Sequence, residues 1–178
     1  MKQKGLLYDQ ANSFGWISII LHWSTALAVL VLWYFGQSIS YQPLAEIDAR
    51  RSLHITIGLI AWLPLAGRIA WRIYGAHPRV KGQSESIHKF AKFSHYLILG
   101  ALTVMIVSGP VMAWALSRSS SIAEVALIFH SNAALLLTAL VMLHVLGALK
   151  HLMFNDDETI ARIFTPRKDV VNDTKPND

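Results

Sequence analysis

The sequence has no cysteine among its 178 residues. This absence excludes disulfide bonds, iron–sulfur clusters bound through thiolates, and a c-type haem, whose covalent attachment needs a Cys-x-x-Cys-His motif. Histidine is the remaining residue type that commonly holds a redox metal, and the chain contains eight histidines. We therefore expect any redox cofactor of this protein to be bound through imidazole.

Charged side chains are also scarce. They make up 15% of the chain, whereas hydrophobic residues make up 53%, and a typical soluble domain has roughly 25% charged residues. The mean hydropathy of +0.39 is high for a soluble protein. The formal net charge of +5 does not indicate a nucleic-acid partner, because the basic residues lie between apolar segments and form no continuous stripe. We expect a membrane protein whose surroundings are lipid.

Four apolar segments are long enough to cross the hydrocarbon core of a bilayer, which takes roughly 20 helical residues. We predict membrane helices at about residues 14–37, 47–73, 93–116 and 122–154. Pro64 and Pro110 lie inside the second and third segments, where each predicts a kink. The predicted fold is an all-α bundle of four transmembrane helices. It forms one domain over residues 1–168, followed by a polar, disordered tail over residues 169–178.

The basic residues are distributed unequally between the two sides of this predicted bundle. Four crossings place both termini on the same side, and all but three of the 16 lysine and arginine residues fall on that side. The exceptions are Arg50, Arg51 and Arg118. Cytoplasmic segments of membrane proteins are enriched in lysine and arginine, so we predict that both termini are cytoplasmic. This pattern agrees with a multi-pass protein of the bacterial inner membrane, with its other face in the periplasm.

Four histidines fall at two depths of the predicted bundle. His130 and His144 lie on the fourth segment, and a spacing of fourteen helical residues gives a rise of about 21 Å and an angular offset of about 40°. His54 enters from the periplasmic side, as His130 does, whereas His22 lies on the cytoplasmic side with His144. The expected pairs are therefore His54 with His130 and His22 with His144. Two imidazoles from different helices are what bis-histidine ligation of haem in a four-helix bundle requires.

Two alternative roles for these histidines also fit the sequence. A histidine-lined transporter of metal ions or protons would need no haem, although zinc prefers three or four ligands gathered in one place. The rings would alternatively serve as hydrogen-bonding contacts between helices. A polar side chain in hydrocarbon is costly, so four of them at two matched depths favour cofactor binding over both alternatives.

Four stretches of the chain resemble the four helices of the prokaryotic cytochrome b561 family. They are IILHWSTALAVLVLW at residues 19–33, SLHITIGLIAWLPLAGRIAWRI at 52–73, FSHYLILGALTVMIVSGPVM at 93–112 and LHVLGALKHLMFNDDETIARI at 143–163. The resemblance covers residues 15–167. It implies two b-type haems whose iron is held by His22, His54, His130 and His144, in agreement with the pairing by depth.

The same resemblance implies an activity. The best-defined member of the family passes an electron from superoxide to ubiquinone, so a superoxide:ubiquinone oxidoreductase is the implied enzyme. The haem ligands do not determine the substrate, and a simple electron carrier stays open. A second alternative is a di-haem, quinone-reactive membrane subunit that receives electrons from a hydrogenase or dehydrogenase partner protein.

Two further histidines, His95 and His151, lie near the predicted cytoplasmic haem. In the family they resemble residues beside a quinone pocket, where an imidazole hydrogen-bonds a quinone carbonyl and delivers a proton. We therefore expect both at a quinone site. His151 is also near a helix end, where a cation suits the helix dipole and the interface. Arg68 lies fourteen residues after His54, and we expect it to reach a haem propionate or to line the quinone pocket.

Arg50 and Arg51 directly precede His54 on the side opposite the termini. They would attract an anionic donor such as superoxide toward the periplasmic haem by focusing the electrostatic field. The alternative, which we favour, is that they pair with Glu46 and Asp48.

Overall fold

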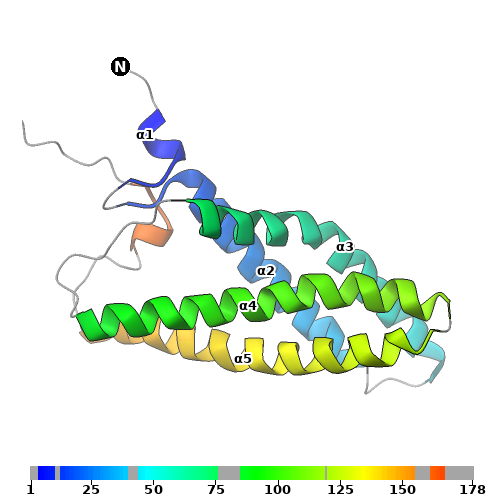
Figure 1. The fold of residues 1–178 in the computed structure, drawn as a ribbon. Coiled ribbons are helices and arrows are strands. Elements are labelled where there is room, and N and C mark those ends of the chain that lie inside the picture. Colours follow the sequence, from blue (N-terminus) through cyan, green and yellow to red (C-terminus); the bar gives the residue numbers. More distant parts are fainter. Residues whose placement is uncertain are drawn as a thin grey trace, which may run out of the picture.

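The structure is a computed structural model that describes residues 4–10, 13–39, 44–75, 85–118, 120–154 and 161–166. All regular secondary structure within these ranges is helical (Figure 1). The elements are α1 (Lys4–Leu7), α2 (Trp16–Ile39), α3 (Leu44–Tyr74), α4 (Glu85–Leu116), α5 (Ile122–Phe154) and a short 3-10 helix, η1 (Ala161–Ile163). The predicted polar tail at residues 169–178 lies outside the described residues.

The four long helices, α2 to α5, are long and apolar enough to cross a membrane. This confirms the predicted all-α architecture with four helices that are able to span a membrane. The helix boundaries agree closely with the prediction except at α4, which begins at Glu85 instead of near residue 93. The additional turns are polar, and Lys89 pairs with Glu85 across one turn at 2.8 Å. An i,i+4 pair of this kind stabilises helix outside the hydrocarbon, where apolar runs give no signal.

The helices pack as two hairpins, α2 with α3 and α4 with α5, and α3 joins the two hairpins through its contact with α4 (Figure 1). A small core lies where α3 meets α4 and α5, and consists of Ala61, Leu65, Ile69, Ala101, Leu102 and Leu137. Many large apolar side chains point outward, among them Leu63 at 74% and Leu135 at 72% exposure. Such a surface suits lipid, so burial inside the protein is confined to a few positions.

We call the end of the bundle where α2 and α4 begin the terminal end, because α1 and η1 also lie there (Figure 1). The opposite end, where α2 and α4 finish, is the far end. At the terminal end, both carboxylate oxygens of Asp9 accept hydrogen bonds at 2.8 Å, from the Gly15 amide and the Ser18 hydroxyl. Trp71 of α3 donates to the same hydroxyl at 2.7 Å. This network caps α2 and ties it to α3.

The segment that follows α5 returns to α2. The indole nitrogen of Trp23 donates to the backbone carbonyl of Ile163 at 2.9 Å, and the rings of Trp23 and Phe164 are 4.9 Å apart. Both ends of the described chain are therefore attached to the terminal end of α2.

Pro110 lies inside α4, and its missing amide hydrogen leaves the Ile106 carbonyl without the usual helical partner. The indole nitrogen of Trp62, on α3, donates to that carbonyl at 3.0 Å. A backbone group freed by proline inside a membrane is commonly satisfied by a neighbouring helix. Trp62 therefore joins the two hairpins at the point where α4 is weakest.

Replacing Trp62 with phenylalanine should lower the free energy of unfolding by about 1 kcal/mol, because the Ile106 carbonyl loses its hydrogen bond. Unfolding of the detergent-solubilised protein, followed by circular dichroism, measures the change. In a Pro110→Ala background the carbonyl regains an amide donor from its own helix, so the same substitution should cost less. An equal cost in both backgrounds would show that Trp62 acts through packing alone.

Candidate functional site

Four of the histidines face one another in two pairs. The ring centroids of His22, on α2, and His144, on α5, are 6.3 Å apart. The centroids of His54, on α3, and His130, on α5, are also 6.3 Å apart. The structure thus brings together the same pairs that the depths of the residues indicate, one at the terminal end and one at the far end of α5.

The separation within each pair suits a shared metal ion. A bond between a transition metal and an imidazole nitrogen is about 2 Å long, so an ion held by two imidazoles places the ring centres roughly 6 Å apart. Hydrogen-bonding contacts between helices would need the helices themselves to approach closely. The helix pairs that pack closely are α2 with α3, α3 with α4, and α4 with α5. Each histidine pair instead spans helices that do not pack closely on one another.

Glycines back both rings of the far pair. A Cβ atom added to Gly36, on α2, would lie 3.3 Å from Cε1 of His54, and one added to Gly109, on α4, would lie 3.3 Å from Cε1 of His130. Nδ1 of His54 is buried without a hydrogen bond of good geometry, although the backbone carbonyl of Leu32 lies near the ring. These contacts seat Nδ1 and Cε1 of both rings against neighbouring helices and leave Nε2 for a ligand.

His95, on α4, joins the terminal pair. Its ring centroid is 5.0 Å from that of His144, with the two ring planes at 79°. Nδ1 of His95 is 2.6 Å from the carbonyl oxygen of Ala91, so this nitrogen carries the hydrogen and donates it. Arg68, on α3, lies within electrostatic range of His22, His95 and His144. The terminal level therefore combines three imidazoles with one guanidinium.

The remaining predicted site residues are placed less fully. His151 lies in α5 beyond His144, but its side chain is outside the described residues. The side chain of Glu46 also lies outside the described residues. Arg51 forms an ion pair with Asp48, in agreement with the prediction that the arginines at this end pair with nearby acids.

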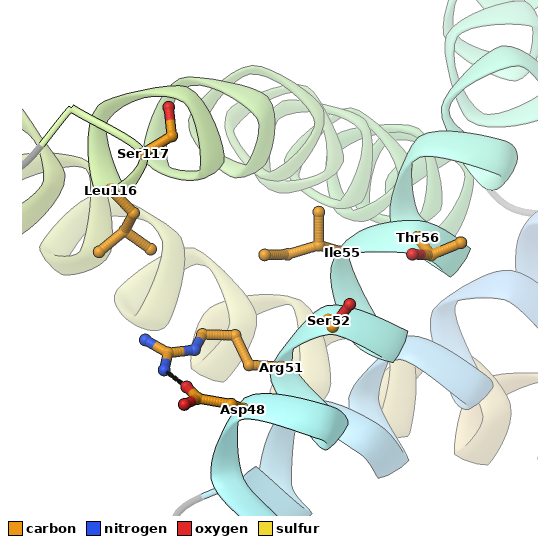
Figure 2. Close-up of a pocket in the computed structure, with 7 residues that line it drawn as sticks. All are labelled: Asp48, Arg51, Ser52, Ile55, Thr56, Leu116 and Ser117. Atoms are coloured by element: carbon orange, nitrogen blue, oxygen red, sulfur yellow. Dashed lines mark hydrogen bonds and ion pairs between the residues drawn. The ribbon is translucent and has the colours of Figure 1, made fainter.

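A shallow pocket of about 300 Å³ lies beside that ion pair, between the start of α3 and the end of α4 (Figure 2). It is lined by Asp48, Arg51, Ser52, Ile55, Thr56, Leu116 and Ser117.

A zinc-type centre finds no support in the described part of the chain. No group of three or more histidine, cysteine, aspartate or glutamate side chains there is placed to hold a metal ion. Structural zinc needs four such ligands and catalytic zinc needs three. A haem needs only two axial ligands from the protein, since the porphyrin supplies the other four.

The comparison with protein families decides between these possibilities. A family model described as prokaryotic cytochrome b561 matches residues 13–166, which include all four long helices. The chain belongs to the prokaryotic cytochrome b561 family. No significant match was found among curated proteins. A member of the cytochrome b561 family is a multi-pass membrane protein that transfers electrons by means of b-type haem.

The two histidine pairs fit the needs of this cytochrome b561. Each pair supplies two imidazoles from different helices at a separation that suits one metal ion between them. The sequence did not reveal Gly36 and Gly109 as neighbours of the far pair, nor Ser108, whose hydroxyl oxygen lies 3.0 Å from Nδ1 of His130. The only signal for them was their depth, since small residues at the level of a histidine on another helix can make room for its ring.

Replacing Gly109 with alanine should disturb one haem and leave the other unchanged. The new Cβ would lie 3.3 Å from Cε1 of His130, so the ring must shift, whereas a Cβ at Gly100 of the same helix meets nothing within 4 Å. Gly100→Ala is therefore the matched control, and Gly36→Ala tests the His54 ring in the same way. Haem content and the reduced-minus-oxidised spectrum measure the effect. If the Gly109→Ala protein matches the control in haem content and in spectrum, the close packing of the His130 ring against Gly109 is not needed for haem binding.

Proposed function

We propose that this cytochrome b561 moves electrons across the membrane between two b-type haems. His54 and His130 would hold one haem at the far end, and His22 and His144 would hold the other at the terminal end. The observation that carries the proposal is the equal 6.3 Å separation of both pairs at two levels of α5. When bound, haem supplies reversible one-electron chemistry, while the protein supplies ligands, spacing and an apolar surround.

The terminal level is the proposed side of the electron acceptor, ubiquinone. Conversion of a quinone to a quinol takes up two electrons and two protons, so the site needs groups that bind and deliver protons. His95 lies there beside His144, and we assign His151 to the same quinone site because it follows His144 on α5. An imidazole can hydrogen-bond a quinone carbonyl and pass on a proton. Arg68 adds a positive charge that suits a haem propionate or the reduced quinone.

The far level is the proposed side of the electron donor. We propose superoxide, which loses one electron and becomes dioxygen, so two superoxide ions supply the two electrons of one quinol. The excess of lysine and arginine on the terminal side supports cytoplasmic termini in a bacterial inner membrane, with the far level toward the periplasm. The pairing of Arg51 with Asp48 argues against strong steering of an anion by Arg51.

A reduced-minus-oxidised absorption spectrum of protein expressed with ample haem tests the proposed ligands. The wild-type protein should contain two b-type haems per chain. His130→Ala and His144→Ala should each lose a different haem, because each removes one axial ligand of one level. The double variant should be colourless. Retention of both haems in the double variant, or a colourless wild-type protein, would overturn the assignment.

Stopped-flow mixing with superoxide, with and without a soluble ubiquinone analogue, tests donor and acceptor separately. Superoxide should reduce the haems, and the quinone analogue should reoxidise them. Both changes are followed through the haem absorption bands. His151→Ala should keep both haems but slow reoxidation on the order of 100-fold, if the imidazole delivers a proton. Lys150→Ala, one residue away, is the control and should leave the rate unchanged. Normal reoxidation in His151→Ala would remove that residue from the quinone site.

A further inference from the structure

Ser108, on α4, is a buried polar residue that the proposed ligand set does not use. It is 7% exposed, and its hydroxyl oxygen lies 2.6 Å from the carbonyl oxygen of Val104 and 3.0 Å from Nδ1 of His130. A serine in a membrane helix often bonds only to its own backbone. Ser108 does so and in addition contacts a proposed haem ligand on the neighbouring helix.

The two contacts determine which atom donates. A carbonyl oxygen only accepts, so the single hydrogen of the Ser108 hydroxyl is donated to Val104 at the shorter distance. The serine oxygen is then left as an acceptor, and Nδ1 of His130 must carry the hydrogen that it donates across 3.0 Å. This tautomer leaves the lone pair of Nε2 free, which is the state that binds a metal.

The other ligand of the far level lacks such a side chain. Nδ1 of His54 is buried near the backbone carbonyl of Leu32 and forms no hydrogen bond of good geometry with any described residue. The terminal level differs again, because the positive charge of Arg68 acts on both His22 and His144. The two levels of the bundle are therefore unlike in the groups that surround their imidazoles.

These surroundings have opposite effects on a bound haem. A hydrogen bond accepted from Nδ1 makes the imidazole a stronger electron donor, which stabilises oxidised iron and lowers its reduction potential. A nearby positive charge favours the reduced form, since reduction removes one positive charge from the iron. Electrons move spontaneously from the lower to the higher potential, so this difference favours transfer from the far level to the terminal level.

We propose that Ser108 is a positioning residue that orients His130 and lowers the reduction potential of the far haem, and so helps to set the direction of electron transfer. The proposal rests on the proposed ligation of that haem by His54 and His130. Ser108 contributes no ligand and touches no substrate, so its effect should appear in the properties of one haem.

The test is a spectroelectrochemical titration of wild-type protein and variants in detergent. The far haem is identified as the component that His130→Ala removes. Ser108→Ala deletes the acceptor with little change of volume, and should raise the potential of the far haem. At a fixed applied potential, its ratio of reduced to oxidised haem should rise by up to roughly fivefold, the limit reached when the lost hydrogen bond stabilises the oxidised state alone. The terminal haem should keep its potential.

Ser131→Ala is the matched control. Ser131 follows His130 directly, and its hydroxyl bonds to the Leu127 carbonyl at 2.8 Å, as Ser108 bonds to Val104, but it makes no described contact with a ligand. This variant should leave both potentials unchanged. Ser108→Thr keeps the hydroxyl and should restore the wild-type potential. Ser108→Cys, whose sulfur is a weak acceptor, should give a far-haem potential between those of wild type and Ser108→Ala. It replaces Ser108→Ala in the test if the alanine variant loses haem.

The outcomes separate this inference from the proposed function. If wild-type protein contains two haems but Ser108→Ala and Ser131→Ala have equal far-haem potentials, Ser108 has no positioning role, while the ligand assignment stands. The inference also fails if Ser108→Thr shifts the potential as far as Ser108→Ala does. If His130→Ala removes no haem, the ligand assignment itself is wrong.

Discussion

An imidazole placed in hydrocarbon is costly unless something compensates it, and this constraint shapes the protein. α5 brings His130 and His144 into the bundle at two depths, and each meets a histidine from the other hairpin at 6.3 Å. The backbones of α2 and α3 lie apart from that of α5, although Leu137 of α5 reaches the small core that α3 and α4 form. The arrangement leaves room between paired imidazoles, as a family of b-type cytochromes requires.

Small residues beside the histidine rings, and a hydrogen bond between helices at a proline, make this open packing compatible with a stable bundle. Gly36 and Gly109 let two rings lie against neighbouring helices, where a methyl group would be only 3.3 Å away. Trp62 satisfies the carbonyl that Pro110 frees, and in doing so joins α3 to α4 at 3.0 Å. These specific contacts add to the small core, against which further apolar side chains of α2, α4 and α5 pack.

The two levels are chemically different, which matters for a protein that transfers electrons. Ser108 accepts a hydrogen bond from one imidazole of the far level, whereas Arg68 places positive charge near the terminal level. His95 adds a third imidazole at the terminal level only, within 5.0 Å of His144. A proton-consuming acceptor such as quinone suits the level that has the additional imidazole and the guanidinium.

The number of membrane-spanning helices, the extent of their apolar runs and the depth of each histidine follow from the sequence alone, whereas the polar turns that extend α4 back to Glu85 do not. Long apolar runs define spans, and the fixed rise of an α-helix places His130 and His144 at different depths. The tertiary structure decided which side chains meet: Ser108 lies behind His130, the ring of His95 contacts that of His144, and Trp62 donates to the Ile106 carbonyl. The physical reason is that membrane helices are apolar on nearly every side, so hydropathy does not tell which face meets lipid and which meets protein.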